Sequence, residues 1–86
     1  MKGRRVYPDK NGELHLKEGD YGYHPRAGWQ CRPYGFHVGG IGGHDVVEHG
    51  DGTITVSPSI LLTDFDTDGK TIQWHGYLEK GIWRTV

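Results

Sequence analysis

Glycine and proline interrupt this chain so often that no long helix is expected. The 86 residues include fifteen glycines and four prolines, and no window places apolar residues at helical spacing over several turns. Short runs of β-branched and aromatic residues lie between the turn residues instead, which is typical of strands joined by tight turns. The sequence therefore predicts an all-β fold with little or no helix.

Three pairs of these runs have the form of antiparallel β-hairpins, with a glycine-containing loop between two arms. The arms are residues 4–7 with 14–17, 45–49 with 53–57, and 71–78 with 82–86. We expect about six to eight short strands in a compact barrel or two packed sheets. Residues 18–43 are rich in Gly, Pro, Tyr and His, so we expect long loops there, with short strands near 28–31 and 36–38.

The length and the single cysteine limit how such a fold can be stabilised. The chain makes one small domain, 1–86, and a domain of this size buries only roughly 60–65% of its unfolded surface. Cys31 is the only cysteine, so no internal disulfide supports the core, and three Trp, five Tyr and two Phe must fill it. A lone cysteine mildly favours a cytoplasmic location.

The charge and hydropathy of the chain argue against two classes of partner. Ten Lys and Arg balance eleven Asp and Glu, whereas nucleic-acid-binding domains are usually basic. No stretch approaches the roughly 20 apolar residues that span a membrane. The start, MKGRRVYPDK, has no apolar run of the kind found in a signal peptide. Nucleic acid and membrane are therefore not the expected partners.

Residues 31–37, CRPYGFH, look like half of a zinc site, with a thiol and an imidazole on either side of a turn. A structural zinc site needs four N or S ligands, of which Cys31 and His37 would be two. Three further histidines are available to complete the set: His24, His44 and His75. The alternative is a reduced cysteine packed in the core beside Trp29.

Residues 64–75, DFDTDGKTIQWH, begin like a calcium-binding loop. Three aspartates at alternate positions, followed by Gly69 for the sharp turn, match the first half of that motif. The twelfth position should be a bidentate Glu, but it is His75. The alternative is a polar hairpin loop in which Asp and Gly perform ordinary turn chemistry.

Residues 37–45, HVGGIGGHD, form a glycine-rich stretch between two histidines. No Gly-Lys-Ser/Thr follows, and no helix is expected to follow, so neither a P-loop nor a dinucleotide fingerprint is present. A flexible loop or bulge is the plain interpretation, and a backbone nest for an anion is the functional one.

Ser57 or Ser59 with His75 and Asp64 would have the composition of a Ser-His-Asp triad. No Gly-x-Ser-x-Gly nucleophile elbow is present, however. The segment around the serines, SPSI, is better interpreted as a strand end. Pro58 lacks a donor for the ladder, so we expect it at an edge or a bulge.

Aromatic residues and arginines alternate loosely in the middle of the chain. This composition occurs in platforms for single-stranded nucleic acid, in protein-binding hot spots and in ordinary aromatic cores. The residues are Tyr21, Tyr23, Arg26, Trp29, Arg32 and Tyr34.

The order of three motifs resembles a family of small phage and bacterial proteins known as domain of unknown function 6527. The motifs are GWQC, DGTITVSPSI and WHGYLEKGIW, and the likeness covers about residues 28–84. In that family a Trp precedes a close Cys pair, an SPSI-type motif follows a hairpin, and a Cys-x-x-His leads into the last strands. The resemblance implies a small domain with a zinc-ribbon-like site.

Only two of the four ligands implied by the resemblance are present here. Cys31 matches the first Cys of the pair, and His75 matches the terminal His. The other two positions fall on Tyr34 or Gly35 and on Ile72 or Gln73. Either His37 and another histidine replace the missing ligands, or the metal is lost and aromatic residues stabilise the core in its place. Those residues are Trp74, Tyr77 and Trp83.

Together these patterns predict a small non-enzymatic binding protein, phage-encoded and located in the host cytoplasm, that acts on a protein partner such as host or defence machinery. The expected contact residues are Trp29, Arg32, Tyr34, His37 and His44. One alternative is a structural zinc domain or small metalloenzyme that uses Cys31, His37, His44 and His75. Another is a nucleotide or nucleic-acid binder that uses the glycine loop with Arg26 and Arg32. Exposed edge strands also permit a homo-oligomer.

Overall fold

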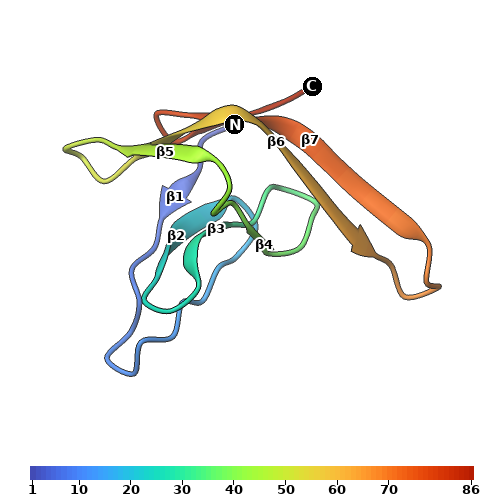
Figure 1. Ribbon diagram of the computed structural model, residues 1–86, viewed down its shortest axis with the longest axis horizontal. Helices are drawn as coiled ribbons and strands as arrows, with labels where there is room; N and C mark the ends of the chain where they lie inside the picture. Colours follow the sequence, from blue (N-terminus) through green and yellow to red (C-terminus); the bar gives the residue numbers. More distant parts are fainter.

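The computed structural model describes all 86 residues and confirms an all-β domain of two packed four-stranded sheets (Figure 1). None of its segments is a helix of the length and apolarity that crossing a bilayer requires. The strands are β1 (Arg4–Arg5), β2 (Asp20–His24), β3 (Gly28–Cys31), β4 (Gly39–Gly40), β5 (Asp45–Glu48), β6 (Ile54–Phe65), β7 (Thr71–Glu79) and β8 (Ile82–Thr85).

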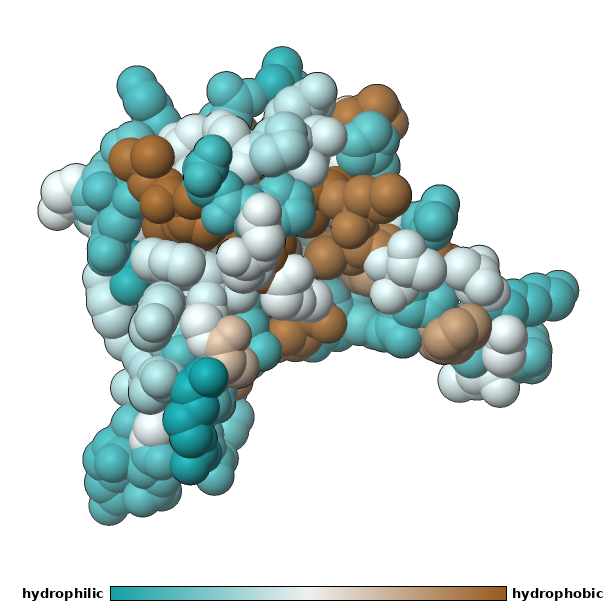
Figure 2. All heavy atoms as spheres, in the orientation of Figure 1, coloured by the Kyte–Doolittle hydropathy of each residue, from teal (hydrophilic) through white to brown (hydrophobic).

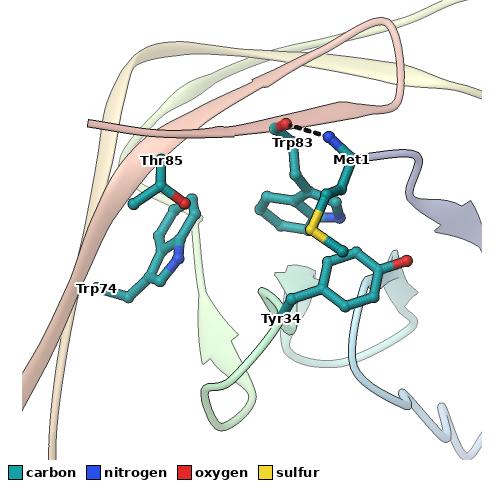
Figure 3. Close-up of a pocket in the computed structure, with 5 residues that line it drawn as sticks. All are labelled: Met1, Tyr34, Trp74, Trp83 and Thr85. Carbon is teal, nitrogen blue, oxygen red and sulfur yellow. Dashed lines mark hydrogen bonds between the residues drawn. The ribbon is translucent and has the colours of Figure 1, made fainter.

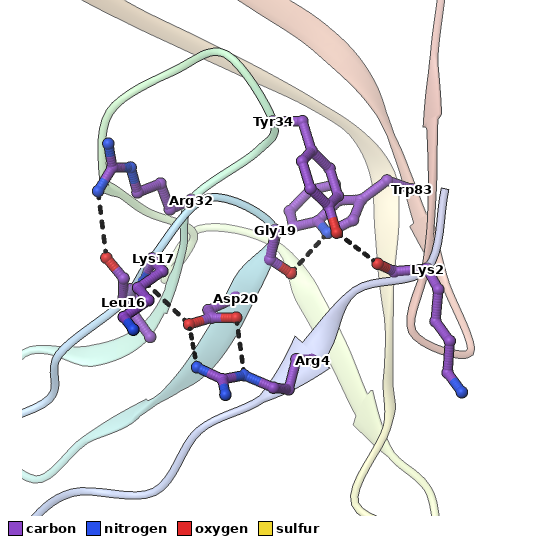
Figure 4. Close-up of polar contacts among 9 residues, drawn as sticks. All are labelled: Lys2, Arg4, Leu16, Lys17, Gly19, Asp20, Arg32, Tyr34 and Trp83. Carbon is purple, nitrogen blue, oxygen red and sulfur yellow. Dashed lines mark hydrogen bonds and ion pairs between the residues drawn. The ribbon is translucent and has the colours of Figure 1, made fainter.

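The first sheet, in the order β1-β2-β3-β4, departs from the predicted pattern at its start. The predicted hairpin of 4–7 with 14–17 is wrong, because β1 pairs with β2, and in parallel. Two features favour this long-range pairing. The carboxylate of Asp20 accepts hydrogen bonds from the Arg4 guanidinium at 2.9 and 3.1 Å (Figure 4). Gly22 has no side chain, and a Cβ there would lie 2.3 Å from the Val6 carbonyl oxygen.

Elsewhere in this sheet the prediction is partly confirmed. The strand expected near 28–31 is β3, which pairs antiparallel with β2. The strand expected near 36–38 is not formed. Residues 33–38 form a loop that turns at residues 34–36, and the short β4 follows it at Gly39–Gly40. We call this loop the 33–38 turn.

The second sheet, in the order β5-β6-β7-β8, is antiparallel throughout and confirms the other two hairpins. Its longest strand corrects the expected strand end at SPSI, because β6 continues to Phe65. The register shifts between Val56 and Ile60. Pro58 therefore lies at a bulge, as its missing backbone donor predicts.

The core lies between the sheets and draws on both. Trp83 of β8 is buried, and its Nε1 donates to the Gly19 carbonyl next to β2 at 2.9 Å (Figure 4). Phe36, from the turn between β3 and β4, is buried beside these strands. The complete cluster is Tyr21, Cys31, Phe36, Ile41, Ile54, Val56, Ile60, Leu62, Leu78 and Trp83.

The first residues of the chain lie along β8. The Met1 nitrogen donates to the Trp83 carbonyl at 2.8 Å, and the Trp83 nitrogen donates to the Met1 carbonyl at 2.7 Å. Gly3 donates to Gly81 at 2.7 Å, and Lys2 pairs with Ile82. The beginning and end of the described chain are thus held side by side.

The β6–β7 hairpin projects away from the rest of the molecule (Figure 1). β5 pairs with β6 only up to Ser57, and β8 pairs with β7 only from Gly76 onward. Residues 60–65 and 71–75 therefore form a two-stranded segment, which we call the ribbon. Apolar atoms gather at the centre of the molecule, close to the base of this projection (Figure 2).

Candidate partner-binding pocket

A pocket of about 170 Å³ lies where the ribbon joins the body of the domain (Figure 3). Its walls come from four parts of the chain: the first residue, the 33–38 turn, β7 and β8. The lining residues are Met1, Tyr34, Trp74, Trp83 and Thr85. Four of the five are apolar or aromatic, so the pocket offers mainly ring faces and edges.

The two tryptophans of the pocket are held edge to face. The rings of Trp74 and Trp83 lie 5.4 Å apart at 90°, which is a favourable aromatic geometry. Gly76 makes room for this arrangement, because a Cβ there would lie 2.5 Å from the Trp74 ring. The hydrogen bond from Trp83 to Gly19 fixes the second ring from behind.

Tyr34 closes the other side of the pocket from the 33–38 turn. Its hydroxyl donates to the Lys2 carbonyl at 2.7 Å, and its ring lies over Gly19, where a Cβ would be 2.4 Å away (Figure 4). The residue remains 39% exposed. Tyr34 is thus oriented by its polar end and presents its ring, a common arrangement for an aromatic contact residue.

Arg32, another predicted contact residue, supports the turn from within. Its Nε donates to the Phe36 carbonyl at 3.0 Å, and its Nη1 donates to the Leu16 carbonyl at 3.3 Å. Both bonds are to backbone oxygens inside the domain. Arg32 therefore positions the 33–38 turn, and through it Tyr34.

His37 joins the same turn to the ribbon. Its Nδ1 lies 2.7 Å from an oxygen of Asp64, and both side chains are about half exposed. The bond from His37, followed by one from the Phe65 N–H, lowers the pKa of the Asp64 carboxyl below its ordinary value. Close by, Leu62 of the ribbon packs where a side chain on Gly39 would be.

Trp29 lies apart from the pocket. It faces Tyr23 across the β2–β3 pair, with ring centroids 5.3 Å apart. The Arg5 guanidinium stacks over the rings of both Trp29 and Tyr7, at 4.9 and 4.4 Å. The predicted contact set is therefore divided, because Tyr34 and Trp29 line different surfaces.

Two more of the predicted histidines, His44 and His75, face Ser59. The Nε2 of His44 lies 3.1 Å from the Ser59 carbonyl, which leaves its Nδ1 buried without a partner. The Nε2 of His75 lies 3.0 Å from the Ser59 hydroxyl. The residues of the possible Ser-His-Asp triad do not come together. Asp64 bonds His37, and the Ser59–His75 pair has no third group that orients the imidazole.

Cys31 is fully buried in the core beside Tyr21, and burial raises the pKa of its thiol to about 12. Its sulfur and the imidazoles of His37 and His75 do not converge as a ligand group. The only three side chains of ligand type whose atoms lie together are the exposed Asp9, Glu13 and His15.

The aspartates of residues 64–75 do not converge either. Asp66 instead accepts hydrogen bonds from the backbone of Asp68 and Lys70, both at 2.9 Å. Gly69 adopts a positive φ of 79° in the same turn. This is the arrangement expected of a polar hairpin loop.

The sequence predicted one wall of the pocket as a contact residue and did not predict the other walls. Tyr34 was predicted as a contact residue, whereas Trp74 and Trp83 were predicted only as core residues. Alternate residues of a strand face the same side of a sheet. This rule could have placed the rings of Trp74 and Trp83 on one face of the β7–β8 hairpin. No family model, curated protein or solved structure matches this chain. The resemblance to the domain of unknown function 6527 family stays a prediction.

Proposed function

We propose that this chain is a small non-enzymatic binding protein whose aromatic pocket receives one large apolar side chain of a protein partner. The observation that carries the proposal is the pocket itself, with Tyr34, Trp74 and Trp83 around one cavity. Trp and Tyr at well-packed pockets dominate the binding energy of many protein interfaces. The predicted role of Tyr34 as a contact residue belongs to this proposal.

The size and chemistry of the pocket favour a side chain over other ligands. Small-molecule sites usually measure about 300–1,000 Å³, and this pocket is well below that range at about 170 Å³. No charged side chain lines it. The Met1 ammonium, the one charged group of a lining residue, donates to the Trp83 carbonyl at 2.8 Å. An aromatic or aliphatic side chain of a partner protein fits both observations. As part of the same proposal, that partner is a host or defence protein.

Thr85 permits a test that leaves the walls of the pocket in place. Thr85 is exposed at the end of β8, so Thr85→Phe fills the cavity from its rim without removing a buried group. Thr63→Phe is the matched control, because Thr63 is also exposed and lies on the opposite face of the ribbon from Trp74.

The experiment is selection of random linear peptides on the immobilised protein, followed by affinity measurement on the synthetic peptides selected. We expect the selected peptides to share one aromatic or large aliphatic residue. Thr85→Phe should weaken their binding by at least about tenfold, which is the scale of a lost hot-spot contact. Thr63→Phe should bind like the parent. A selection without a shared apolar residue, or equal binding by both variants, would contradict the proposal.

A further inference from the structure

We infer that the bond between His37 and Asp64 makes binding at the pocket depend on pH, with tighter binding where both side chains are charged. The inference rests on the proposed function and adds a regulation of the same site. The two residues lie on the two elements whose aromatic side chains form opposite walls of the pocket (Figure 3). Those walls are Tyr34 on the 33–38 turn and Trp74 on the ribbon.

Asp64 lies on the face of the ribbon that carries the pocket wall. Leu62 pairs with Trp74, and Asp64 pairs with Ile72. Paired residues share a face of a sheet, and so do alternate residues of one strand, so these four side chains lie on one face. Leu62 is buried and packs over Gly39, so this face is turned toward the body of the domain. Asp64 extends the same row toward the tip of the ribbon.

His37 belongs to the turn that holds Tyr34. Phe36, between them, is buried, and Arg32 donates a hydrogen bond to its carbonyl at 3.0 Å. The hydroxyl of Tyr34 is bonded to the start of the chain. The turn is thus fixed to the body, and from it His37 reaches Asp64 at 2.7 Å. This is the one hydrogen bond that joins the turn to the ribbon.

The ribbon depends on such contacts because it has only two strands and projects from the body (Figure 1). An isolated two-stranded hairpin is marginally stable in water. The orientation of the ribbon sets the spacing between Trp74 and Tyr34, because one residue lies on the ribbon and the other on the body. The bond between His37 and Asp64 therefore helps to hold the pocket in one shape. A preformed site binds more tightly than one that must be ordered on binding.

The strength of this bond depends on the protonation of His37. Histidine is the side chain that ordinarily changes its charge between about pH 5 and 8. Asp64 is ionised over this range, because the bond from His37 and that from the Phe65 N–H lower the pKa of its carboxyl. Protonated His37 thus forms an ion pair with Asp64, whereas the neutral imidazole keeps only a hydrogen bond. Charge-assisted hydrogen bonds are the stronger kind, so binding should weaken as the pH rises.

No other charged side chain pairs with His37 or Asp64. His75 lies on the outer face of the ribbon, where it bonds Ser59. On the 33–38 turn, the Gly35 N–H donates to the Glu18 carboxylate. The charged residues of the surrounding elements form no ion pair: Glu18, Arg32, Asp66, Asp68 and Lys70. The charge of His37 is therefore matched by Asp64 alone.

His37→Asn tests the inference without touching the pocket. Asparagine keeps an N–H donor close to the place of Nδ1, but it does not titrate. The chain has six histidines, and the other five remain in this variant. Any pH dependence that they cause therefore persists in it. Circular dichroism and thermal unfolding at pH 6 and pH 8 would verify that the parent and the variant are folded.

The probe is the tightest selected peptide, synthesised without histidine and with blocked termini, and its affinity is measured by titration calorimetry at pH 6 and pH 8. We expect the parent to bind about two- to fivefold more tightly at pH 6, which is the range that exposed ion pairs span. His37→Asn should bind equally at the two pH values. The same pH dependence in both proteins, or none in the parent, would overturn the inference and leave the pocket proposal intact. Binding unaffected by Thr85→Phe would instead remove the pocket proposal itself.

Discussion

The thiol of Cys31 provides a measurement that separates a core residue from a metal ligand. Cys31 has no exposed surface, and burial raises the pKa of its thiol from 9.0 to about 12. The thiolate is both the nucleophile and the metal ligand. Because each pKa unit is a factor of ten, at pH 8 its population is lower by about a thousandfold than in an unperturbed cysteine.

Labelling with an aromatic disulfide reagent measures this population directly. We expect the native protein to react far more slowly than the same protein in denaturant, with native labelling limited by unfolding. Fast labelling of the native protein would refute the argument. So would one zinc per chain, measured by elemental mass spectrometry, that is lost in Cys31→Ala.

The same shift predicts that stability falls at alkaline pH. Above pH 9 the unfolded chain releases the thiol proton, while the folded chain retains it up to about pH 12. The folded state therefore binds more protons in this window, and the free energy of unfolding decreases by up to about 1.4 kcal/mol per pH unit. Cys31→Ala lacks this term, so its deficit relative to the parent should narrow from pH 9 upward in urea titrations. A constant deficit would contradict the buried-thiol explanation.

Three further substitutions test the ribbon and its base. Gly76→Ala should destabilise the fold by about 1–3 kcal/mol, because its Cβ would overlap the Trp74 ring, and a shift in tryptophan fluorescence should accompany the lower urea midpoint. Leu62→Ala should lower the free energy of unfolding by about 2–5 kcal/mol, since it empties a buried position at the base of the ribbon. Asp64→Asn should lower the melting temperature only above the carboxyl titration, because the lowered pKa of Asp64 stabilises the fold at higher pH and this contribution is lost on acidification. Equal melting-temperature losses at pH 3 and pH 7 would contradict a role for the bond with His37.

The parts of the fold that were predictable from sequence are those encoded by local pattern. The hairpins at 45–57 and 71–86 form because a glycine turn separates two runs rich in β-formers. The bulge at Pro58 follows from one missing donor. The pairing of β1 with β2 was not predictable in this way. It depends on Asp20 reaching Arg4 across sixteen residues of sequence and on the absence of a side chain at Gly22.

The candidate site shows the same division between local and long-range information. Tyr34 could be singled out because an aromatic residue on a Pro-Gly turn is expected at the surface. The convergence of Met1, Trp74 and Thr85 around it depends on where separate segments meet, and no spacing in the sequence encodes that meeting. At Cys31 local and spatial information differ, because its neighbours in sequence resemble a ligand set while its neighbours in space are apolar.

The contact between the first residues and β8 has a consequence for how fast this domain folds. Met1 and Trp83 exchange two backbone hydrogen bonds although they are 82 positions apart in the sequence. Closing a loop of that length opposes folding by roughly 4 kcal/mol of chain entropy. Domains dominated by such distant contacts fold on the millisecond-to-second scale. The pocket is complete only when that loop has closed, because Met1 and Trp83 line it together.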